Sequence, residues 1–383
     1  MPSMKDVQAA LNDAQAMRHA DRELLSLALM QSRNRTLAWL GALERFDAAR
    51  WTAGRAAWWQ ERWIARNVQR LRGAAADATR TALASIEPQA DSWWREPVAG
   101  AAPDADVTRA YLAETLEITL DLLAGAEGND DALHWYRAAL FEEDALLLRF
   151  AALAQTERVA SVKPLLAERL LRPVRSPLWM PAERWMLGSS RGGFVPACEQ
   201  WAHEEPVPEF EIDAQPVTWQ QFAEFVEDGG YDDASRWSEA GAAWLAASAR
   251  RTPRDVEQLR HGVLLQRFGQ LVRAPAGEPA SMLSWFEAEA WCRWAGRRLP
   301  TELEWELAVS RGSSRGVSWD DVPEWTAGRA RAWPGGPPVR DTTQRVQRGL
   351  AWFEPRRLAH PKARRFVAPA CDDGFAGFRS CAS

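Results

Sequence analysis

The sequence predicts an α+β protein, with a helical bundle over residues 1–170 followed by a mixed domain over residues 178–383. From about residue 5 to 170, apolar residues recur at helical spacing in a composition dominated by Ala, Leu, Arg and Glu. Residues 171–182 contain three prolines, which interrupt the helical pattern and place a domain boundary near 165–178. Beyond the boundary, short apolar runs, glycine pairs and tryptophan-rich loops indicate a domain with little regular sheet.

Length and charge limit the classes of function. A chain of 383 residues exceeds what one hydrophobic core usually serves. The net charge is −5, from 47 basic and 52 acidic residues, so we expect no nucleic-acid partner and no membrane partner. The sequence has no apolar run of about eighteen residues and begins without an apolar signal segment, so we expect a cytoplasmic protein. Four scattered cysteines indicate reduced thiols.

The bundle is expected to contain five helices joined by short turns and one long connection. Their expected ranges are about 5–19, 20–47, 52–72, 106–124 and 130–156. Residues 85–105, rich in Pro, Asp, Ala and Gly, are expected to form the long connection. In the second domain, helices are expected over 218–228, 237–250 and 253–260, and a further pair over 284–308.

The helix pair over 284–308 has the clearest local signals. Ser284 with Glu287, and Thr301 with Glu304, each fit the reciprocal capping box, in which a hydroxyl and a carboxylate satisfy the unpaired amides of a first helical turn. Gly296 is expected to end the first helix. The sequence therefore predicts two short helices joined by a tight turn.

The amino-acid sequence of this region also resembles that of a known family. The run Trp291-Cys-Arg-Trp-Ala-Gly-Arg-Arg-Leu-Pro-Thr-Glu-Leu-Glu-Trp-Glu306 resembles the signature of the formylglycine-generating-enzyme-like superfamily, which has a C-type-lectin-like fold. Other matching blocks are Val217-Thr-Trp-Gln-Gln-Phe-Ala-Glu-Phe-Val226, Gly229-Gly-Tyr231, Asp321-Val-Pro-Glu-Trp-Thr326, Arg348-Gly349 and Gly377-Phe-Arg-Ser-Cys381. The resemblance implies this fold for residues 178–383, with the last block buried.

The whole chain resembles the sulfoxide synthases of ergothioneine biosynthesis and the selenoneine synthases, in which a DinB-like helical bundle precedes such a domain. Gly54-Arg-Ala-Ala-Trp-Trp-Gln-Glu-Arg-Trp63 and Ala139-Leu-Phe-Glu-Glu-Asp-Ala-Leu146 are similar to two blocks of that bundle. In the family, three histidines from these blocks hold a ferrous ion that activates oxygen. Two of them lie four residues apart, on one helical face and about 6 Å from each other.

The metal-ligand histidines are missing from this sequence. The positions of this sequence that match the family's three metal-ligand histidines are Arg55, Glu142 and Leu146. Arg55 has no lone pair to offer and Leu146 has no donor atom, so Glu142 alone could bind a metal. We therefore expect no metal cofactor, and we predict that Arg55 and Glu142 form a salt bridge between their helices. A rearranged site of His134, Glu142 and Asp144 stays an alternative.

The positions that hold substrate in the family have also changed. The segment that helps hold a trimethylammonium group reads Arg364-Arg-Phe-Val367 here, and Arg365 places a second cation where the family has asparagine. Surplus arginines favour an anionic ligand instead. The candidate ligand-binding residues, expected around a cleft between the domains, are Arg55, Glu142, Trp352, Arg356, Arg364, Arg365 and Phe366.

Three functions follow from these patterns. The first is a diverged, metal-free member of the synthase family, a pseudoenzyme that binds a small-molecule ligand or a protein partner in the interdomain cleft. The alternative is an active oxygen-dependent enzyme that uses Fe(II) to form a carbon–sulfur or carbon–selenium bond on a histidine betaine. A purely structural partner protein is the third. Ligand identity, residual catalytic activity and oligomeric state stay open at this point.

Overall fold

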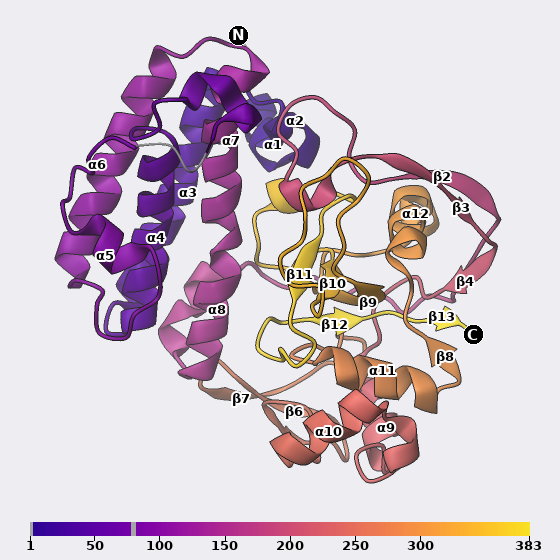
Figure 1. Ribbon diagram of the computed structural model, residues 1–383. Coiled ribbons are helices and arrows are strands. Elements are labelled where there is room, and N and C mark those ends of the chain that lie inside the picture. Colours follow the sequence, from indigo (N-terminus) through magenta and orange to yellow (C-terminus); the bar gives the residue numbers. More distant parts are fainter. Residues whose placement is uncertain (1–2, 78–81) are drawn as a thin grey trace. The chain divides into compact units, whose positions relative to one another are not determined.

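The computed structural model describes residues 3–77 and 82–383 (Figure 1). Contacts divide the chain into two units. Unit 1 comprises Met1–Leu166, Gly192–Val195 and Glu354–Leu358, and unit 2 comprises Ala167–Arg191, Pro196–Phe353 and Ala359–Ser383. Two short segments from the range expected for the second domain thus make their contacts with the helices of unit 1.

Unit 1 is helical, and its α3, α4, α6 and α7 run alongside one another (Figure 1). Leu25, Leu29, Tyr136 and Leu140 are among the buried side chains between them. The helices and 3₁₀ turns are α1 Met4–Asn12, α2 Ala14–Arg18, α3 Arg22–Leu43, α4 Asp47–Trp63, η1 Arg70–Ala75, α5 Ala90–Trp94, α6 Ala105–Ala124, α7 Asp130–Ala145, α8 Leu147–Thr156, η2 Ala160–Leu165 and η6 Arg356–Leu358.

Two of the expected helices are divided. The helix expected over 5–19 breaks at Asp13, whose carboxylate accepts a hydrogen bond from the backbone N–H of Ala16 and so caps α2. The helix expected over 130–156 breaks at Leu146, whose N–H donates to the carbonyl of Glu143, three residues back. A tightened turn at Leu146 therefore separates α7 from α8.

The connection expected over 85–105 contains a short helix, α5. Its Trp94 is fully buried and stacks on Tyr111, with ring centroids 4.4 Å apart. The indole also lies so close to Gly54 of α4 that a Cβ there would stand 1.9 Å from its Nε1 atom. Glycine at position 54 is thus what lets α5 approach α4.

Buried charge pairs join the helices of unit 1. Glu143 accepts hydrogen bonds from Nε of Arg33 at 2.9 Å, from Nη2 of Arg33 at 3.0 Å and from the Thr36 hydroxyl at 2.8 Å. Asp144 accepts from the Ser32 hydroxyl at 2.7 Å and from the guanidinium of Arg357. Because these groups have lost water, the structure depends on the pairs staying complete.

Unit 2 combines short strands with four helices. Its sheets are, in strand order, β1 Leu178–Met180, β4 Phe210–Ile212, β13 Cys381–Ala382 and β8 Arg297–Arg298; β11 Arg365–Val367, β10 Arg345–Arg348, β9 Glu324–Arg329 and β12 Gly377–Phe378; β2 Glu183–Leu187 and β3 His203–Val207; and β5 Val256–Gln258, β6 Leu264–Arg267 and β7 Gln270–Arg273. The helices and 3₁₀ turns are α9 Trp219–Glu227, α10 Glu239–Ser248, α11 Trp285–Trp294, α12 Glu302–Gly312, η3 Ala197–Glu199, η4 Ala234–Arg236 and η5 Ser313–Arg315.

The predicted helix pair is confirmed, and one predicted helix is wrong. Both capping boxes form, at Ser284 before α11 and at Thr301 before α12. Gly296 takes a left-handed conformation with φ 64° after α11, as predicted. The helix expected over 253–260 is replaced by β5, because Asp255 has φ 61°, which a helix does not accommodate.

The C-terminal block is buried, as predicted. β12 pairs in parallel with β9, and the side chains of Phe378 and Arg379 are fully buried. The Arg379 guanidinium donates to both carboxylate oxygens of Glu324.

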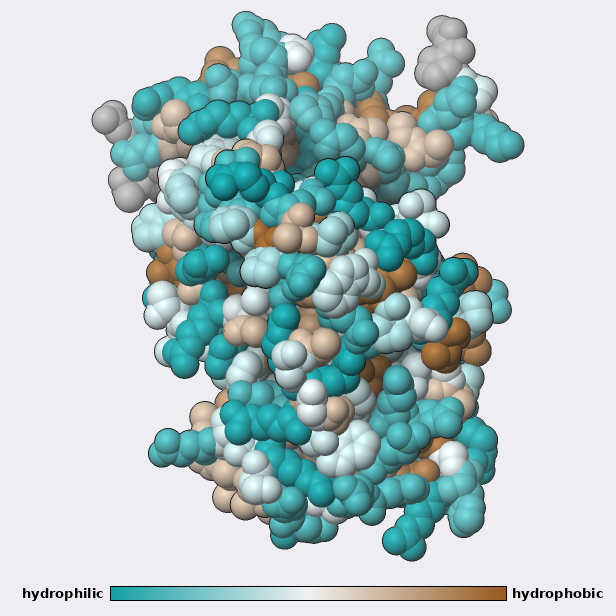
Figure 2. Space-filling view, turned by 90° about the vertical axis from the view of Figure 1, so that its right-hand side faces the viewer, coloured by the Kyte–Doolittle hydropathy of each residue, from teal (hydrophilic) through white to brown (hydrophobic). Residues whose placement is uncertain are grey.

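Among the described residues, no helix is long and apolar enough to cross a bilayer. Hydrophobic groups on the face shown in Figure 2 are scattered among hydrophilic ones.

Candidate functional site

Arg55, Glu142 and Leu146, which match the family's metal-ligand positions, line one cavity inside unit 1. Its volume is about 250 Å³. One wall comes from α4, a second from the residues just after α5, and a third from the end of α7 and the start of α8. The lining residues are Trp51, Arg55, Ala56, Trp59, Arg95, Glu96, Pro97, Glu142, Leu146 and Arg149.

Helical spacing explains why these side chains meet. Trp51, Arg55 and Trp59 follow one another at four-residue steps, so they share a face of α4. Glu142 and Leu146 are four residues apart in the same way, across the turn that ends α7. The sequence blocks of the resemblance therefore meet at one cavity.

Arg55 is held by the end of α5 rather than by Glu142. Its Nη1 donates to the backbone carbonyl oxygens of Trp94, at 3.2 Å, and of Arg95, at 3.0 Å, and its guanidinium lies 4.3 Å from the ring centre of Trp58. The predicted salt bridge is wrong: no ion pair among the described residues joins Arg55 to Glu142. The unpaired carbonyls at a helix end attract the cation instead.

Glu142 faces the cavity without a direct partner. Among the described residues, none forms a hydrogen bond or an ion pair with its carboxyl group, which reaches solvent through the cavity. Burial by the surrounding protein raises its pKa, and the charges of Arg55 and Arg149 partly oppose that rise. This carboxyl group is therefore available to a ligand and can hold a proton above its usual range.

The cavity does not fit the ferrous ion of the family. Glu142 is the only one of the three positions with a suitable donor atom. Within residues 3–77 and 82–383, no group of three His, Cys, Asp or Glu side chains could hold a metal ion. A facial set of three ligands is therefore not assembled in the described chain.

The rearranged site around His134 is not assembled either. The His134 ring packs edge-on against Trp135, with centroids 4.8 Å apart, and near Phe194, and burial lowers its pKa. Asp144 is occupied by Ser32 and by Arg357. His134 is thus a packed bundle histidine.

Arg364 serves unit 2 internally. Its guanidinium donates to both carboxylate oxygens of Glu302, at 2.6 and 2.9 Å, and to the backbone carbonyl of Cys198 at 2.7 Å. The rings of Trp333 and Phe366 lie 3.9 and 4.8 Å from it. The expectation that Arg364 contacts a ligand is corrected, because its donors are used within the fold.

The remaining candidates do not lie around the bundle cavity. The Trp352 indole donates to the carbonyl of Ala167 at 3.2 Å in unit 2. Arg365 and Phe366 are in β11, opposite β10. Arg356 is in η6, where its neighbour Arg357 is the fully buried residue.

Sequence reasoning missed several residues of the cavity. Trp51 and Trp59 could have been found, because each is four residues from Arg55 on a predicted helix. Arg95 and Glu96 carry no such signal, since they follow a short helix inside a segment predicted to be irregular. Arg149 lies one turn beyond Leu146, in α8.

Comparisons with known proteins agree with the resemblance. Residues 181–322 match the Sulfatase-modifying factor enzyme 1-like domain. The chain is 31% identical over 232 residues to the hercynine oxygenase of Mycobacterium tuberculosis, covering 47% of this chain and 54% of that protein. It is 33% identical over 185 residues to the formylglycine-generating enzyme of the same organism, covering 42% and 60%. It is 31% identical over 194 residues to the inactive C-alpha-formylglycine-generating enzyme 2 of Mus musculus, covering 45% and 59%.

These matches confirm that the chain resembles the ergothioneine-type synthase family and carries a formylglycine-generating-enzyme-type domain. The chain spans about half the length of the curated hercynine oxygenase that it matches.

Proposed function

We propose that this chain is a metal-free relative of the hercynine oxygenases, and that its bundle cavity binds a small anionic ligand with an apolar body. One observation carries the proposal: the three positions that match iron ligands in the family line a single cavity, and they offer one carboxyl group where iron needs three donors. The cavity is retained while the metal chemistry is not.

The charges of the cavity favour an anion. Three guanidinium groups, of Arg55, Arg95 and Arg149, line it together with the carboxyl groups of Glu96 and Glu142. The pKa of Glu142 is raised, which reduces the negative charge that the two carboxyl groups contribute to the cavity. Arg149 has no ion-pair partner among the described residues, so its donors are available to a carboxylate or a phosphate.

The apolar part of the ligand is inferred from the walls. Trp51, Trp59, Ala56 and Leu146 give the cavity an apolar surface between its charged groups. A volume of about 250 Å³ suits a small metabolite and excludes a folded partner. The arginines would neutralise the charge of such an anion.

The similarity to a hercynine oxygenase favours the active alternative, an oxygen-dependent enzyme acting on a histidine betaine. That activity requires an iron site, which Arg55 and Leu146 do not supply. The inactive C-alpha-formylglycine-generating enzyme 2 of Mus musculus is a relative without that domain's catalytic activity, which supports the metal-free alternative.

Metal content separates the two functions. After anaerobic loading with ferrous iron and desalting, mass spectrometry should find far less than one iron per chain of the unmodified protein. The variant Arg55→His/Glu142→His/Leu146→His should retain iron, because three imidazoles would then line the cavity. Arg55→Ala/Glu142→Ala/Leu146→Ala is the matched control and should retain none. One iron per unmodified chain, with thiol oxidation in the presence of a histidine betaine, would establish the active alternative.

Ligand binding is tested with phenylacetate, which joins a carboxylate to an aromatic body. Calorimetric titration should give saturable binding of phenylacetate and little binding of phenylacetamide, which lacks the charge. Arg149→Ala should weaken phenylacetate binding about tenfold, the effect of losing one charged hydrogen bond. Lys5→Ala removes an exposed cation outside the cavity and should leave the affinity unchanged. Equal affinity for the acid and the amide would contradict an anion site.

A further inference from the structure

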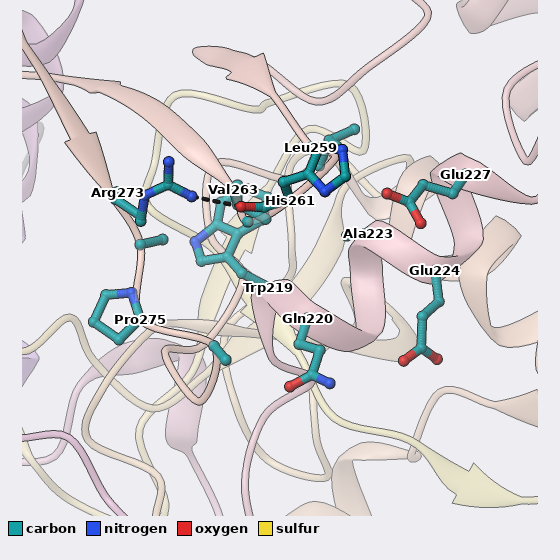
Figure 3. Close-up of a pocket in the computed structure, with 13 residues that line it drawn as sticks. Trp219, Gln220, Ala223, Glu224, Glu227, Leu259, His261, Val263, Arg273 and Pro275 are labelled. Carbon is teal, nitrogen blue, oxygen red and sulfur yellow. Dashed lines mark hydrogen bonds between the residues drawn. The ribbon is translucent and has the colours of Figure 1, made fainter.

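Unit 2 contains a second and larger cavity, of about 750 Å³, between α9 and the segments around β5 and β7 (Figure 3). This volume lies in the range of small-molecule binding sites. The lining residues are Trp219, Gln220, Ala223, Glu224, Glu227, Leu259, His261, Gly262, Val263, Arg273, Ala274, Pro275 and Ala276. Neither the expected ligand residues nor the matched metal positions are among them.

The α9 wall carries two carboxylates beside an apolar floor. Trp219, Ala223 and Glu227 follow one another at four-residue steps, and Gln220 and Glu224 lie beside them. Glu224 and Glu227 are exposed, and within the described chain neither carboxylate has a hydrogen-bond or ion-pair partner. Figure 3 shows the carboxylate of Glu227 beside His261 and that of Glu224 turned away from it, so Glu227 is the nearer contact for a cation and Glu224 adds negative charge to this wall.

The opposite wall is held in place by an internal hydrogen bond. The Arg273 guanidinium donates to the backbone carbonyl of His261 at 2.6 Å. His261 and Gly262 have φ angles of 61° and 104°, which turn the chain between β5 and β6. Figure 3 shows Trp219 lying between Arg273 on one side and Glu224 and Glu227 on the other. The cavity therefore has a negative wall and a positive wall on either side of an aromatic floor.

The floor contains an unused hydrogen-bond donor. Trp219 is 1% exposed, and its indole N–H has no hydrogen-bond partner in the described chain. Figure 3 shows the indole nitrogen on the side of Arg273 and Pro275. A buried donor without an acceptor is costly, so an acceptor oxygen brought in by a ligand would relieve that cost.

We infer that this cavity binds an organic cation that has an apolar body and a carbonyl oxygen. The protonated amine lies against Glu227, within the negative field of Glu224, the apolar body covers Trp219 and Ala223, and the carbonyl oxygen points towards Arg273. An amino-acid amide or the amino-terminal residue of a peptide has this chemistry. The site is independent of the proposed function, because it lies in unit 2 and selects the opposite charge.

The probe is L-phenylalaninamide, titrated calorimetrically into the full chain. It should bind saturably, whereas N-acetyl-L-phenylalaninamide, with the same ring and carbonyl but no charge, should bind at least about tenfold more weakly. Glu224→Gln/Glu227→Gln should weaken binding of the cation by a similar factor and leave the melting temperature unchanged, since both residues are exposed. Glu168→Gln/Glu209→Gln removes two exposed carboxylates outside the cavity and should have no effect.

Three results would overturn the inference. They are the absence of saturable binding of L-phenylalaninamide, equal binding of the acetylated probe, and undiminished binding by Glu224→Gln/Glu227→Gln. Binding that disappears in Glu142→Gln and persists in Glu224→Gln/Glu227→Gln would place the cation in the bundle cavity. That result would contradict the anion site as well, whereas a failure of phenylacetate to bind leaves the unit 2 site standing.

Discussion

Replacing Gly54 by alanine tests how closely α5 packs on α4. A Cβ at position 54 would lie 1.9 Å from Nε1, 2.2 Å from Cε2 and 2.6 Å from Cδ1 of Trp94. Carbon contacts in proteins are optimal at about 3.5–4.0 Å, so the indole would have to retreat by about 1.5–2 Å. Trp94 is fully buried and stacked on Tyr111, and the space for that retreat is already filled.

Two opposing effects determine how much Gly54→Ala changes the free energy of unfolding. Alanine is favoured over glycine inside a helix by about 1 kcal/mol. Overpacking costs about 1–3 kcal/mol, and complete loss of a buried tryptophan costs about 3–5 kcal/mol. We therefore expect Gly54→Ala to lower the free energy of unfolding by about 1–3 kcal/mol, the packing cost exceeding the helical gain.

Gly41 provides the matched control, because it is also a helical glycine and a Cβ there would meet nothing within 4 Å. Gly41→Ala should raise the free energy of unfolding by up to about 1 kcal/mol. Urea denaturation followed by far-ultraviolet circular dichroism measures both changes. If Gly54→Ala is as stable as Gly41→Ala, the close approach of Trp94 to α4 is wrong.

Two further perturbations probe buried charges. Burial raises the pKa of Glu287 to about 7. Because this folded-state pKa lies above the ordinary value, the protonated carboxyl group of Glu287 contributes stability that is fully present at low pH. That contribution, on the order of 3 kcal/mol, is lost as the pH rises through about 7. Glu287→Gln should therefore flatten the dependence of unfolding free energy on pH between about 4.5 and 7; an unchanged slope would contradict the assignment. Asp144→Ala leaves Arg357 buried without its carboxylate and should cost about 3–5 kcal/mol, whereas Asp144→Leu/Arg357→Met should cost much less. Equal losses in the two variants would show that the isolated charge is not the cause.

Local patterns in the sequence predicted local structure well. Ser284 and Thr301 identified their helix starts because a capping box uses neighbouring residues only. The turn at Leu146 was not predictable, since Leu146 lies in a continuous apolar and helical pattern. The strand β5 was missed because the left-handed conformation of Asp255 ends any helix there, and aspartate adopts it without the glycine that would signal it in the sequence.

In the site too, the sequence predicted which side chains share a helix face but not which distant segment contacts them. Helical spacing predicted that Glu142 and Leu146 share a face, and the resemblance implied that Arg55 faces them; all three line one cavity, which lies inside the bundle and not in the expected cleft between the domains. It could not predict the partner of Arg55, because the carbonyls of Trp94 and Arg95 compete for the guanidinium and belong to a helix that the sequence did not predict. The opposite charges of Arg55 and Glu142, on helices that face each other, were therefore not enough to predict a salt bridge between them.

Within one turn of α7, two residues hold the bundle together and their neighbour faces the cavity. Glu143 and Asp144 are buried in charge pairs with Arg33 and Arg357, whereas Glu142 beside them has no direct partner in the described chain. Replacing Glu142 removes no hydrogen bond or ion pair that the described residues show, but a substitution at either neighbour isolates a buried cation. The buried charge pairs therefore hold these helices without any contact from Glu142, and the stability of the protein should not change when chelators are added.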